Sequence, residues 1–518
     1  MIVVPDKKKL VLNTDAAPAI LQAIPHAKEV QHDGQRLIAL NHGPEEAIVL
    51  RNLGIKVPAP IMSYYSWPAR FPAMDHQKET AAFLSANKKA LCLNAPGTGK
   101  TISSLWAADY LMEEGVVRKV LIVCPLSTTK IVWGREIMHH LTHRSFKLLV
   151  GSRQKRLEAL ETPGLQYAII NHDGFTTIAD HLTGFDLVIY DEATALKTPG
   201  SVRYKVFAKW MQVHTPWLWL LTGTPISQNP TDAWTLARLV DSPTVPKSYT
   251  AFKDRVMQKV TTFKWVPRPD ALDVCKQVLQ PSIRYSLDEC KDLPDTNYVG
   301  RLVEMTALQT KAFKDMQDKA IVAFSGGVVS ADNAAVKLGK LVQICCGIVY
   351  GGDGEEFVVD GSLRYDGFKE LIEEIGDKVI VFVPLRSVQE WLRDCLVKDG
   401  YDVAMVHGDT PKSERNDIFH NFQHTDTPKV LLAHPRTAAH GLTLTRAKDI
   451  IWYAPIYSLE HYEQACARIR RLSTEGKTTV WHLYATAFER ELYHRLQHKR
   501  RVLADFLDLV KGVNDDEL

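Results

Sequence analysis

The sequence lacks several features that would place it in a specialised class. No apolar run in its 518 residues approaches the roughly 20 residues that a membrane-spanning helix needs. Its eight cysteines include no CxxC pair, so neither a zinc site nor a disulfide framework is indicated, and reduced thiols are expected. Low-complexity tracts and repeats of fixed period are absent. Because Met1–Pro5 has no signal-peptide layout, we expect a cytoplasmic protein that does not bind a membrane.

The chain also has little excess of charge of either sign. The 63 Lys and Arg residues nearly balance the 60 Asp and Glu residues, so the formal net charge is only +3. Any nucleic-acid partner must therefore be bound by local basic patches and not by a global positive field. The length and the 45% of hydrophobic residues are sufficient for about two to four domains with their own cores.

The most informative stretch is a glycine-rich loop at Asn94–Thr101. It follows the apolar run Ala90–Leu93 and precedes the helix-like run Ile102–Met112. Gly97 and Gly99 let the chain bend so that backbone N–H groups point inward at a helix N-terminus, which is the geometry that binds a triphosphate. The order of strand, glycine turn and helix therefore predicts a phosphate-binding loop.

The polar residues of this loop have expected roles toward ATP and Mg²⁺. Lys100 can reach the β- and γ-phosphates, and the Thr101 hydroxyl can ligate Mg²⁺. Asn94 stands where the strict P-loop pattern has glycine, so the match is to the GxGK[ST] half of that pattern. The loop residues expected to bind the nucleotide are Asn94, Pro96, Gly97, Thr98, Gly99, Lys100 and Thr101.

A second polar motif directly follows the apolar run Leu187–Tyr190. It consists of Asp191 and Glu192. An apolar strand that ends in two acids can hold hydrated Mg²⁺ with one carboxylate and orient the attacking water with the other. We therefore expect Asp191 to bind Mg²⁺ and Glu192 to activate the water. Without the upstream loop, an exposed acidic turn would be the favoured interpretation of these two residues.

Short apolar runs alternate with amphipathic runs in two parts of the chain, which predicts two parallel sheets with helices on both faces. Only the first series contains a glycine loop. The strands expected in the first series are Ala90–Leu93, Val120–Cys124, Tyr167–Ile170, Leu187–Tyr190 and Leu218–Leu221. Those expected in the second are Val379–Val383, Val403–Val406, Val430–Ala433, Ile450–Tyr453 and Thr479–Leu483.

The expected domains follow from these two series. Residues 1–70 are interpreted as a small accessory domain with a linker, and residues 71–245 as the ATP-binding lobe 1. Residues 246–365 lose the alternating rhythm and are interpreted as an inserted or connecting region with helices and a hairpin. Residues 366–518 are interpreted as lobe 2, with a C-terminal helix.

An arginine cluster in the second series suggests how that lobe contributes to the site. On a helix, Arg468 and Arg471 are three residues apart and share a face, so both guanidinium groups can reach one γ-phosphate. Taken alone, the cluster would be favoured as a solvated or nucleic-acid-binding face. Because the second series has no phosphate loop of its own, we expect it to supply these arginines to the nucleotide of the first lobe.

The ordered set of motifs resembles superfamily 2 helicases, and within them the Swi/Snf-type branch of DNA-dependent ATPases. The resemblance covers roughly residues 71–250 and 366–490, and it is strongest to compact phage-encoded or annealing-type helicases. It implies an α/β fold of two RecA-like lobes. The matching motifs are Met74–Gln77, Val120–Pro125 with Trp133 and Glu136, Asp191–Thr194, Leu221–Pro225, His407–Asp409 with Arg415 and Phe422, His440–Ala447, and Gln464–Arg471.

The resemblance implies further roles for individual residues. Gln77 corresponds to the residue that reads adenine, and Arg468 and Arg471 occupy the arginine-finger positions. Residues that couple hydrolysis to DNA are expected to be Thr194, Thr222, Thr224, Gly441 and Gln464. Contacts with the DNA backbone are expected from Ser127, Thr128, Lys130 and Thr443.

The chain departs from the family pattern at three positions. Asn94 replaces an acidic or small residue at the start of the loop, Thr194 replaces a histidine, and Ser473 stands where glycine is favoured. Thr194 bears most directly on the coupling of hydrolysis to DNA, because the missing histidine normally contacts the Thr222–Pro225 segment.

The sequence as a whole predicts an ATP-dependent translocase or helicase that acts on double-stranded or branched DNA in replication, recombination or repair. Single-stranded DNA is a further possible substrate. The alternatives are an RNA-directed ATPase of the same superfamily and a regulatory module that binds ATP without hydrolysing it. We expect a monomer, of phage or bacterial origin, that works with replication or recombination proteins in the cytoplasm of a bacterium or an infected host cell.

Overall fold

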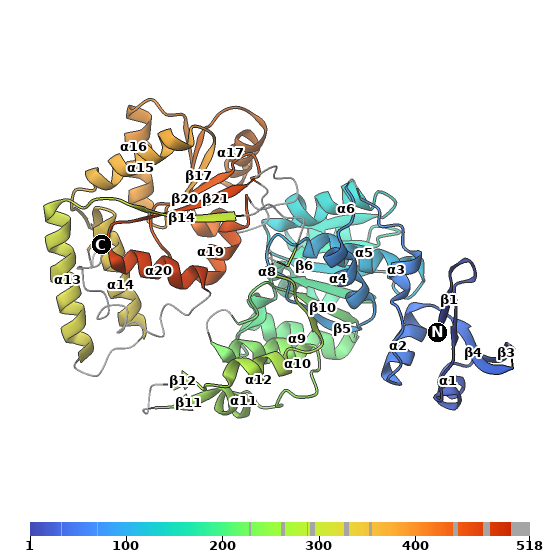
Figure 1. Ribbon diagram of the computed structural model, residues 1–518. Coiled ribbons are helices and arrows are strands. Elements are labelled where there is room, and N and C mark those ends of the chain that lie inside the picture. Colours follow the sequence, from blue (N-terminus) through green and yellow to red (C-terminus); the bar gives the residue numbers. More distant parts are fainter. Residues whose placement is uncertain are drawn as a thin grey trace. The chain divides into compact units, whose positions relative to one another are not determined.

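The computed structural model describes residues 1–518 except 33, 70, 227–228, 261–264, 287–288, 291–295, 326–330, 352–354, 439–443, 470–476 and 499–518. The chain divides into two compact units, of which unit 1 is Met1–Lys291 and unit 2 is Asp292–Leu518. In Figure 1, unit 1 runs from blue to green and unit 2 from yellow-green to red. Each unit is built on its own parallel sheet, so the prediction of two parallel α/β sheets is confirmed.

Unit 1 begins with a small antiparallel sheet of order β1-β2-β4-β3. Alternating apolar residues of its strands pack on two short helices around Leu10, Ile20 and Leu40. Lys8 Nζ lies 2.7 Å from Glu114 Oε1 and ties this small sheet to the main body of unit 1. The elements are β1 (Ile2–Val4), β2 (Lys9–Leu12), α1 (Ala17–Ala23), β3 (Lys28–His32), β4 (Gln35–Asn41), α2 (Pro44–Asn52) and α3 (Pro60–Tyr64).

The main sheet of unit 1 has seven parallel strands in the order β13-β5-β10-β9-β6-β8-β7. Both faces of its central strands are buried: Leu121 and Val123 enter one core cluster, and Ile122 and Cys124 enter the other. The strands are β5 (Lys89–Cys92), β6 (Val120–Cys124), β7 (Phe146–Leu149), β8 (Tyr167–Asn171), β9 (Leu187–Asp191), β10 (Trp217–Leu221) and β13 (Ser282–Ile283).

Helices cover both faces of this sheet. They are α4 (Asp75–Ser85), α5 (Lys100–Glu113), α6 (Arg135–His140), α7 (Arg153–Leu160), α8 (His172–Ile178), α9 (Val202–His214), α10 (Ala233–Leu239), α11 (Tyr249–Val256) and α12 (Ala271–Val278). A two-stranded hairpin, β11 (Met257–Lys259) with β12 (Trp265–Pro267), follows α11.

Unit 2 contains six parallel strands in the order β14-β21-β20-β17-β19-β18, and β15 and β16 form a separate hairpin. The strands are β14 (Thr296–Leu302), β15 (Ile348–Tyr350), β16 (Glu356–Val358), β17 (Val379–Phe382), β18 (Val403–Val406), β19 (Val430–Ala433), β20 (Asp449–Trp452) and β21 (Thr478–Tyr484). The helices are α13 (Ala307–Ser325), α14 (Ala331–Cys345), α15 (Ser362–Ile375), α16 (Arg386–Lys398), α17 (Lys412–His424), α18 (Pro435–Ala438), α19 (Leu459–Cys466) and α20 (Ala487–Gln497).

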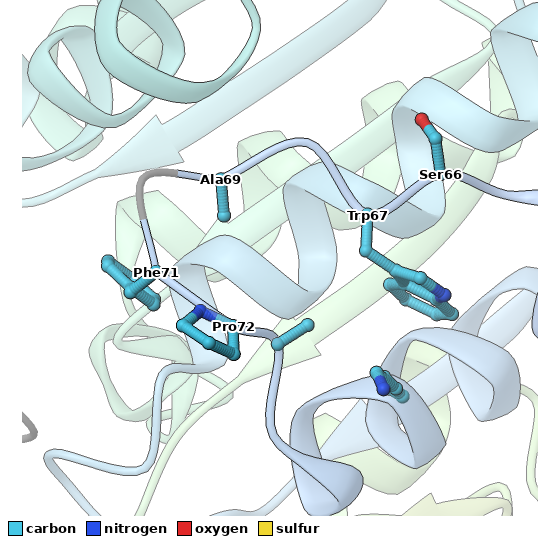
Figure 2. Close-up of a pocket in the computed structure, with 7 residues that line it drawn as sticks. Ser66, Trp67, Ala69, Phe71 and Pro72 are labelled. Atoms are coloured by element: carbon cyan, nitrogen blue, oxygen red, sulfur yellow. The ribbon is translucent and has the colours of Figure 1, made fainter.

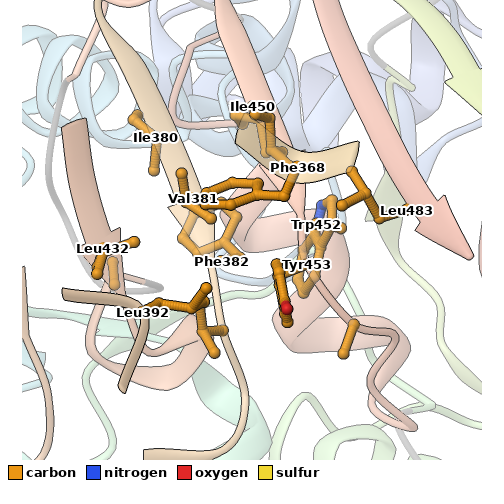
Figure 3. Close-up of a cluster of buried hydrophobic side chains, with 14 of the residues drawn as sticks. Phe368, Ile380, Val381, Phe382, Leu392, Leu432, Ile450, Trp452, Tyr453 and Leu483 are labelled. Atoms are coloured by element: carbon orange, nitrogen blue, oxygen red, sulfur yellow. The ribbon is translucent and has the colours of Figure 1, made fainter. Parts of the chain in front are cut away.

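The core of unit 2 lies between its sheet and the surrounding helices (Figure 3). Phe368 of α15 packs edge-on against Tyr453, with their ring centres 5.3 Å apart. Beneath these rings lies a fully buried ion pair, in which Arg364 Nη2 donates to Glu489 Oε1 at 2.9 Å. The same guanidinium group donates to the carbonyl groups of Tyr453 and Leu483, so this buried charge has several partners.

The segment interpreted as an inserted region, residues 246–365, is divided between the two units. β13 pairs with β5 and extends the sheet of unit 1, whereas β14 pairs with β21 and extends the sheet of unit 2. Backbone pairing over long sequence distances therefore attaches each half of this segment to a different sheet. Among the described residues, none of the helices is both long and apolar enough to cross a membrane.

Candidate nucleotide-binding site

The glycine-rich loop connects the end of β5 to the start of α5, as the sequence predicts. Gly97 and Gly99 have φ angles of 90° and 86°, which side chains other than glycine rarely adopt. A Cβ atom at Gly99 would also collide with the side chain of Gln77 on α4. Both glycines are therefore favoured by the backbone conformation, and Gly99 also by the close approach of Gln77.

Lys100 already points into this loop. Its Nζ donates to the carbonyl oxygens of Asn94 at 2.8 Å and Ala95 at 3.2 Å. An ammonium group held at the loop by two neutral carbonyl groups can exchange them for phosphate oxygens, which are stronger acceptors. The residues present therefore fit a triphosphate.

Gln77 supports this interpretation through an unsatisfied group. The side chain is 1% exposed, and its Oε1 accepts a hydrogen bond from the Met74 backbone N–H at 3.2 Å. Its Nε2 is buried beside Gly99 and has no hydrogen-bond partner in the part of the chain that the structure describes. Because a buried amide donor without an acceptor is costly, a ligand acceptor such as a base nitrogen would stabilise this arrangement.

Asp191 ends β9, two strands along the sheet from the phosphate loop. Its Oδ2 accepts a hydrogen bond from Trp133 Nε1 at 2.9 Å, and its Oδ1 accepts one from the Glu192 N–H at 3.0 Å. Burial, and then the nearby charge of Glu192, raise the pKa of Asp191 to about 6, while the hydrogen bond from Trp133 and the charge of Lys100 oppose this rise. A carboxylate that is costly to ionise here is suited to a cation partner, so the chemistry of Asp191 fits Mg²⁺. Thr101 lies in the first turn of α5, and its role as a Mg²⁺ ligand stays a prediction.

Glu192 follows Asp191 in a strained backbone conformation. Its φ and ψ are 51° and 56°, in the left-handed region that residues other than glycine occupy infrequently. His172 Nε2 lies 2.9 Å from the Asp191 carbonyl oxygen and its ring stacks on Tyr190, which fixes the backbone just before this turn. The strain is localised where the water-activating residue is expected, as is common at functional sites.

The Thr222–Pro225 segment lies against the phosphate loop. The Thr222 N–H donates to the Cys92 carbonyl oxygen at 3.0 Å, and the Thr222 hydroxyl accepts from the Thr224 N–H at 3.2 Å. A Cβ atom at Gly223 would lie only 2.8 Å from Pro96 Cδ. Thr194 is 9% exposed in a short 3-10 turn after Glu192. The coupling roles of these threonines stay predictions.

The expected DNA contacts of unit 1 follow β6. Lys130 is exposed and Ser127 is partly exposed, whereas Thr128 is buried and its hydroxyl donates to the Pro125 carbonyl oxygen at 2.9 Å. Thr128 therefore supports the turn from inside, which leaves Ser127 and Lys130 as the more accessible of the three. Their contacts with DNA stay predictions.

The structure describes only some of the unit 2 residues that are expected to contribute to the nucleotide site. Gln464 lies on α19 and Arg468 follows that helix, with Arg468 Nε donating to the Gln464 carbonyl oxygen at 2.8 Å. Gly441, Thr443 and Arg471 lie outside the described residues. The participation of Arg468 and Arg471 in a nucleotide site of unit 1 therefore stays a prediction.

Sequence reasoning did not identify several residues that support the site. Trp133 was expected only as part of the family motif that begins at Val120, yet it is fully buried and its Nε1 donates to Asp191 Oδ2. His172 and Tyr285 were not singled out at all. His172 stands at the carboxyl end of β8, a position that could have been noted, whereas Tyr285 is 191 residues from its partner Asn94 and gave no local signal.

A separate hollow of about 510 Å³ lies in the segment that leads to Gln77 (Figure 2). Figure 2 shows the side chains of Trp67, Phe71 and Pro72 around it, and Lys78 of α4 also lines it. None of the residues Asn94–Thr101 lines this hollow, so it is distinct from the phosphate loop.

Comparison with known families matches most of the chain. Residues 76–348 match the SNF2-related domain, and residues 364–473 match the helicase conserved C-terminal domain. The putative protein p41 of Acyrthosiphon pisum secondary endosymbiont phage 1 is 24% identical over 447 residues, which are 79% of this chain and 92% of p41.

Two longer eukaryotic relatives match a similar part of the chain. The CHD3-type chromatin-remodeling factor PICKLE of Arabidopsis thaliana is 23% identical over 480 residues, which are 82% of this chain and 33% of PICKLE. The chromodomain-helicase-DNA-binding protein 1-like of Danio rerio is 24% identical over 436 residues, or 78% of this chain and 40% of that protein. The chain thus spans less than half the length of these two relatives.

Among solved structures, a SWI2/SNF2 ATPase core of Sulfolobus solfataricus in complex with dsDNA is 19% identical. The match has a TM-score of 0.41 and covers 87% of this chain and 99% of that structure.

Proposed function

The chain belongs to the SNF2-related domain family, and from that premise we propose that it is an ATP-driven translocase of double-stranded or branched DNA. Members of this family hydrolyse ATP in response to nucleic acid. Two observations together carry the proposal. The phosphate loop holds Lys100, and Gln77 Nε2 is a buried donor that has no hydrogen-bond partner among the described residues. Phosphate and base contacts are thereby available within one unit.

Within this proposal, each group of unit 1 has a defined task. Gln77 Nε2 donates to the adenine ring, and Lys100 exchanges its two carbonyl partners for the β- and γ-phosphates. Mg²⁺, when held by the Asp191 carboxylate and the Thr101 hydroxyl, supplies positive charge to the phosphates. Glu192 accepts the proton of the attacking water.

Unit 2 supplies the remaining positive charge in this proposal. Arg468 and Arg471 contact the γ-phosphate when the two units close on the nucleotide. Because the arginines and the phosphate loop belong to different units, hydrolysis changes the relative position of the units. DNA bound to both units along its phosphate backbone would then be moved by one step, whatever its sequence.

Two observations support DNA as the nucleic acid. The chain belongs to a family whose eukaryotic relatives include proteins named for chromatin remodelling and DNA binding. Its match to phage protein p41 extends over 92% of that protein, so a compact chain of this type occurs in a phage. We therefore place the activity in replication, recombination or repair of DNA.

Steady-state ATP hydrolysis tests the proposal when it is measured with no nucleic acid, single-stranded DNA, duplex DNA, forked DNA and RNA. We expect the strongest stimulation by duplex or forked DNA, and its loss in Lys100→Ala. Stimulation by RNA above DNA would favour an RNA-directed ATPase. Equal rates with every nucleic acid would overturn the DNA assignment, and ATP binding without phosphate release would indicate a regulatory module.

A further inference from the structure

The parallel pairing between β5 and β13 continues beyond both strands into the phosphate loop. The Leu91 N–H donates to the Pro281 carbonyl oxygen at 3.0 Å, and the Leu93 N–H donates to the Ile283 carbonyl oxygen at 2.8 Å. The next bond of the ladder runs from the Ala95 N–H to the Tyr285 carbonyl oxygen at 2.8 Å. Residues 281–285 are therefore attached to the loop itself and not only to the sheet.

Asn94 adds a side-chain link to the same residue. Its Oδ1 accepts a hydrogen bond from the Tyr285 N–H at 2.9 Å, and its Nδ2 donates to Thr80 Oγ1 of α4 at 2.8 Å. The Asn94 side chain is buried, and both ends of its amide are used. The Tyr285 hydroxyl in turn donates to the Glu79 carboxylate of α4. Asn94, which departs from the family pattern, thus joins α4, the phosphate loop and residues 281–285.

Lys100 contacts the same Asn94–Ala95 peptide group that is hydrogen-bonded to Tyr285. The Asn94 carbonyl group, which accepts from Lys100 Nζ at 2.8 Å, and the Ala95 N–H, which donates to Tyr285, belong to one peptide bond. A cation at the carbonyl oxygen polarises that amide and makes its N–H a stronger donor. The bond from Ala95 to Tyr285 is therefore strongest while Lys100 remains on the loop carbonyls, and it weakens when the ammonium group turns to a phosphate.

We propose that Asn94 and Tyr285 are positioning residues that transmit the occupancy of the phosphate loop to the segment leaving unit 1. Unit 1 ends at Lys291, a few residues after Tyr285, so this segment leads to unit 2. Binding of phosphate removes Lys100 from the loop carbonyls, loosens the attachment of Tyr285 and frees the connection for movement of the second unit. The inference rests on the proposed binding of ATP at this loop.

Amide hydrogen exchange tests this proposal, because nucleotide binding should slow exchange in the phosphate loop and speed it in residues 281–286. The full-length protein is compared with and without the non-hydrolysable analogue AMP-PNP and Mg²⁺. We expect slower exchange in peptides covering residues 96–105, whose N–H groups bind phosphate. In the peptide covering residues 281–286 we expect exchange about two- to fivefold faster, because weakening of the bond from the Ala95 N–H to the Tyr285 carbonyl oxygen loosens this residue and exposes the Tyr285 N–H that donates to Asn94 Oδ1.

Three variants test the hydrogen bonds of Asn94 to Tyr285 and to Thr80 separately. Asn94→Leu removes both hydrogen bonds at similar size, and Asn94→Asp keeps an acceptor for the Tyr285 N–H. Thr80→Val removes the partner of Asn94 Nδ2 on α4, together with the Thr80 hydrogen bond to the His76 carbonyl oxygen, and serves as the control. We expect the nucleotide-dependent acceleration at residues 281–286 in the wild type, Asn94→Asp and Thr80→Val. In Asn94→Leu exchange at these residues is already fast without nucleotide, and AMP-PNP changes it no further.

Kinetics supply a second readout that a purely structural role would not move. With saturating DNA, we expect Asn94→Leu to lower kcat about fivefold, as for loss of one hydrogen bond, and to leave the KM for ATP within about twofold. Asn94→Asp, which keeps an acceptor for the Tyr285 N–H, should lower kcat less than Asn94→Leu does. An increase in KM with unchanged kcat would mean that Asn94 supports only the loop, which overturns the inference.

The outcomes also distinguish this inference from the function on which it rests. No response of residues 96–105 to AMP-PNP would contradict ATP binding at the loop, and with it the proposed function. Slower exchange at residues 96–105 with unchanged or slower exchange at 281–286 would contradict the positioning role alone. If Asn94→Leu fails to fold, the response of the wild-type protein at residues 281–286 still decides the question, because unchanged or slower exchange there with AMP-PNP overturns the inference without any variant.

Discussion

Units 1 and 2 contain similar parallel sheets, but one buried polar side chain of each differs in how completely it is hydrogen-bonded. In unit 2, the Arg364 guanidinium has the Glu489 carboxylate and two backbone carbonyl groups as partners. In unit 1, Gln77 Nε2 has no hydrogen-bond partner among the described residues, and Lys100 Nζ donates to two carbonyl oxygens of its own loop. A satisfied charge in a core stabilises the fold, whereas unsatisfied groups at the ends of strands are available to a ligand.

The same comparison shows that a shifted pKa does not by itself indicate a functional site. Burial raises the pKa of Asp191 in unit 1 to about 6 and lowers the pKa of His482 in unit 2 to about 3. Asp191 lies at the carboxyl end of a strand beside Glu192 and Lys100. His482 is enclosed by Tyr462 and Tyr493, with its Nε2 2.9 Å from the Tyr462 hydroxyl oxygen. The location of Asp191 at the carboxyl end of a strand, and not the size of the pKa shift, distinguishes it from His482.

The largest expected effect is a loss of turnover, and a matched change in unit 2 distinguishes it from a loss of stability. Glu192→Gln in unit 1 removes the group that accepts the proton of water, so we expect kcat to fall about 10²- to 10⁴-fold. ATP binding should remain, because the amide has the same shape. Glu489→Gln is the matched change in unit 2, and it should lower stability while turnover by the folded protein persists. Retained turnover in Glu192→Gln would remove its role as base.

The next effect concerns the buried ion pair of unit 2. Arg364→Met leaves the Glu489 carboxylate buried without its cation, which should destabilise unit 2 by about 3 to 5 kcal/mol. Urea unfolding followed by a probe in unit 2 measures this loss. The double change Arg364→Met with Glu489→Leu should recover much of the stability, because no uncompensated charge remains. Equal losses in the single and double variants would contradict this account.

The pH dependence of stability should also differ between the units. Because the folded pKa of His482, about 3, lies below the unfolded value of about 6.5, the unfolded state binds one more proton between these pH values. Stability of unit 2 should therefore fall by about 1.4 kcal/mol for each pH unit of acidification in this range. His482→Phe should abolish this contribution. An unchanged slope in that variant would assign the acid sensitivity to other groups.

The smallest expected effect lies at Asp191. The hydrogen bond from Trp133 favours the ionised carboxylate, so Trp133→Phe should raise the pKa of Asp191 further above its ordinary value. The acid limb of the pH profile for ATP hydrolysis should then move to higher pH, with a higher Mg²⁺ requirement near pH 6. A profile that does not move would separate Trp133 from the ionisation of Asp191.

The parts of the fold that could be predicted from sequence are those with dense local signals. β6, β8 and β9 are five-residue, mostly apolar strands, and their positions were predicted closely. β13 has only two residues, and most residues of β14 are partly or fully exposed, so neither resembles a buried strand. Their attachment depends on backbone pairing across the chain, which no local pattern reveals.

In the candidate site too, only residues with a local sequence signal could be predicted. Lys100 and Asp191 stand next to their strands and could be identified from spacing alone. The contacts that tune them could not be identified, because Trp133 and Asp191 are 58 residues apart and Asn94 and Tyr285 are 191 residues apart. The sequence therefore predicts candidate reacting groups but not the residues that contact them.

The central claim is that ATP binds in unit 1 but is hydrolysed only with an arginine from unit 2. The most direct test measures binding of a fluorescent ATP analogue and DNA-stimulated turnover in Arg468→Ala. The account predicts an affinity within about threefold of the wild type and a loss of turnover of about 10³-fold or more, as for an arginine finger. Wild-type turnover in Arg468→Ala would contradict the claim and confine the chemistry to unit 1.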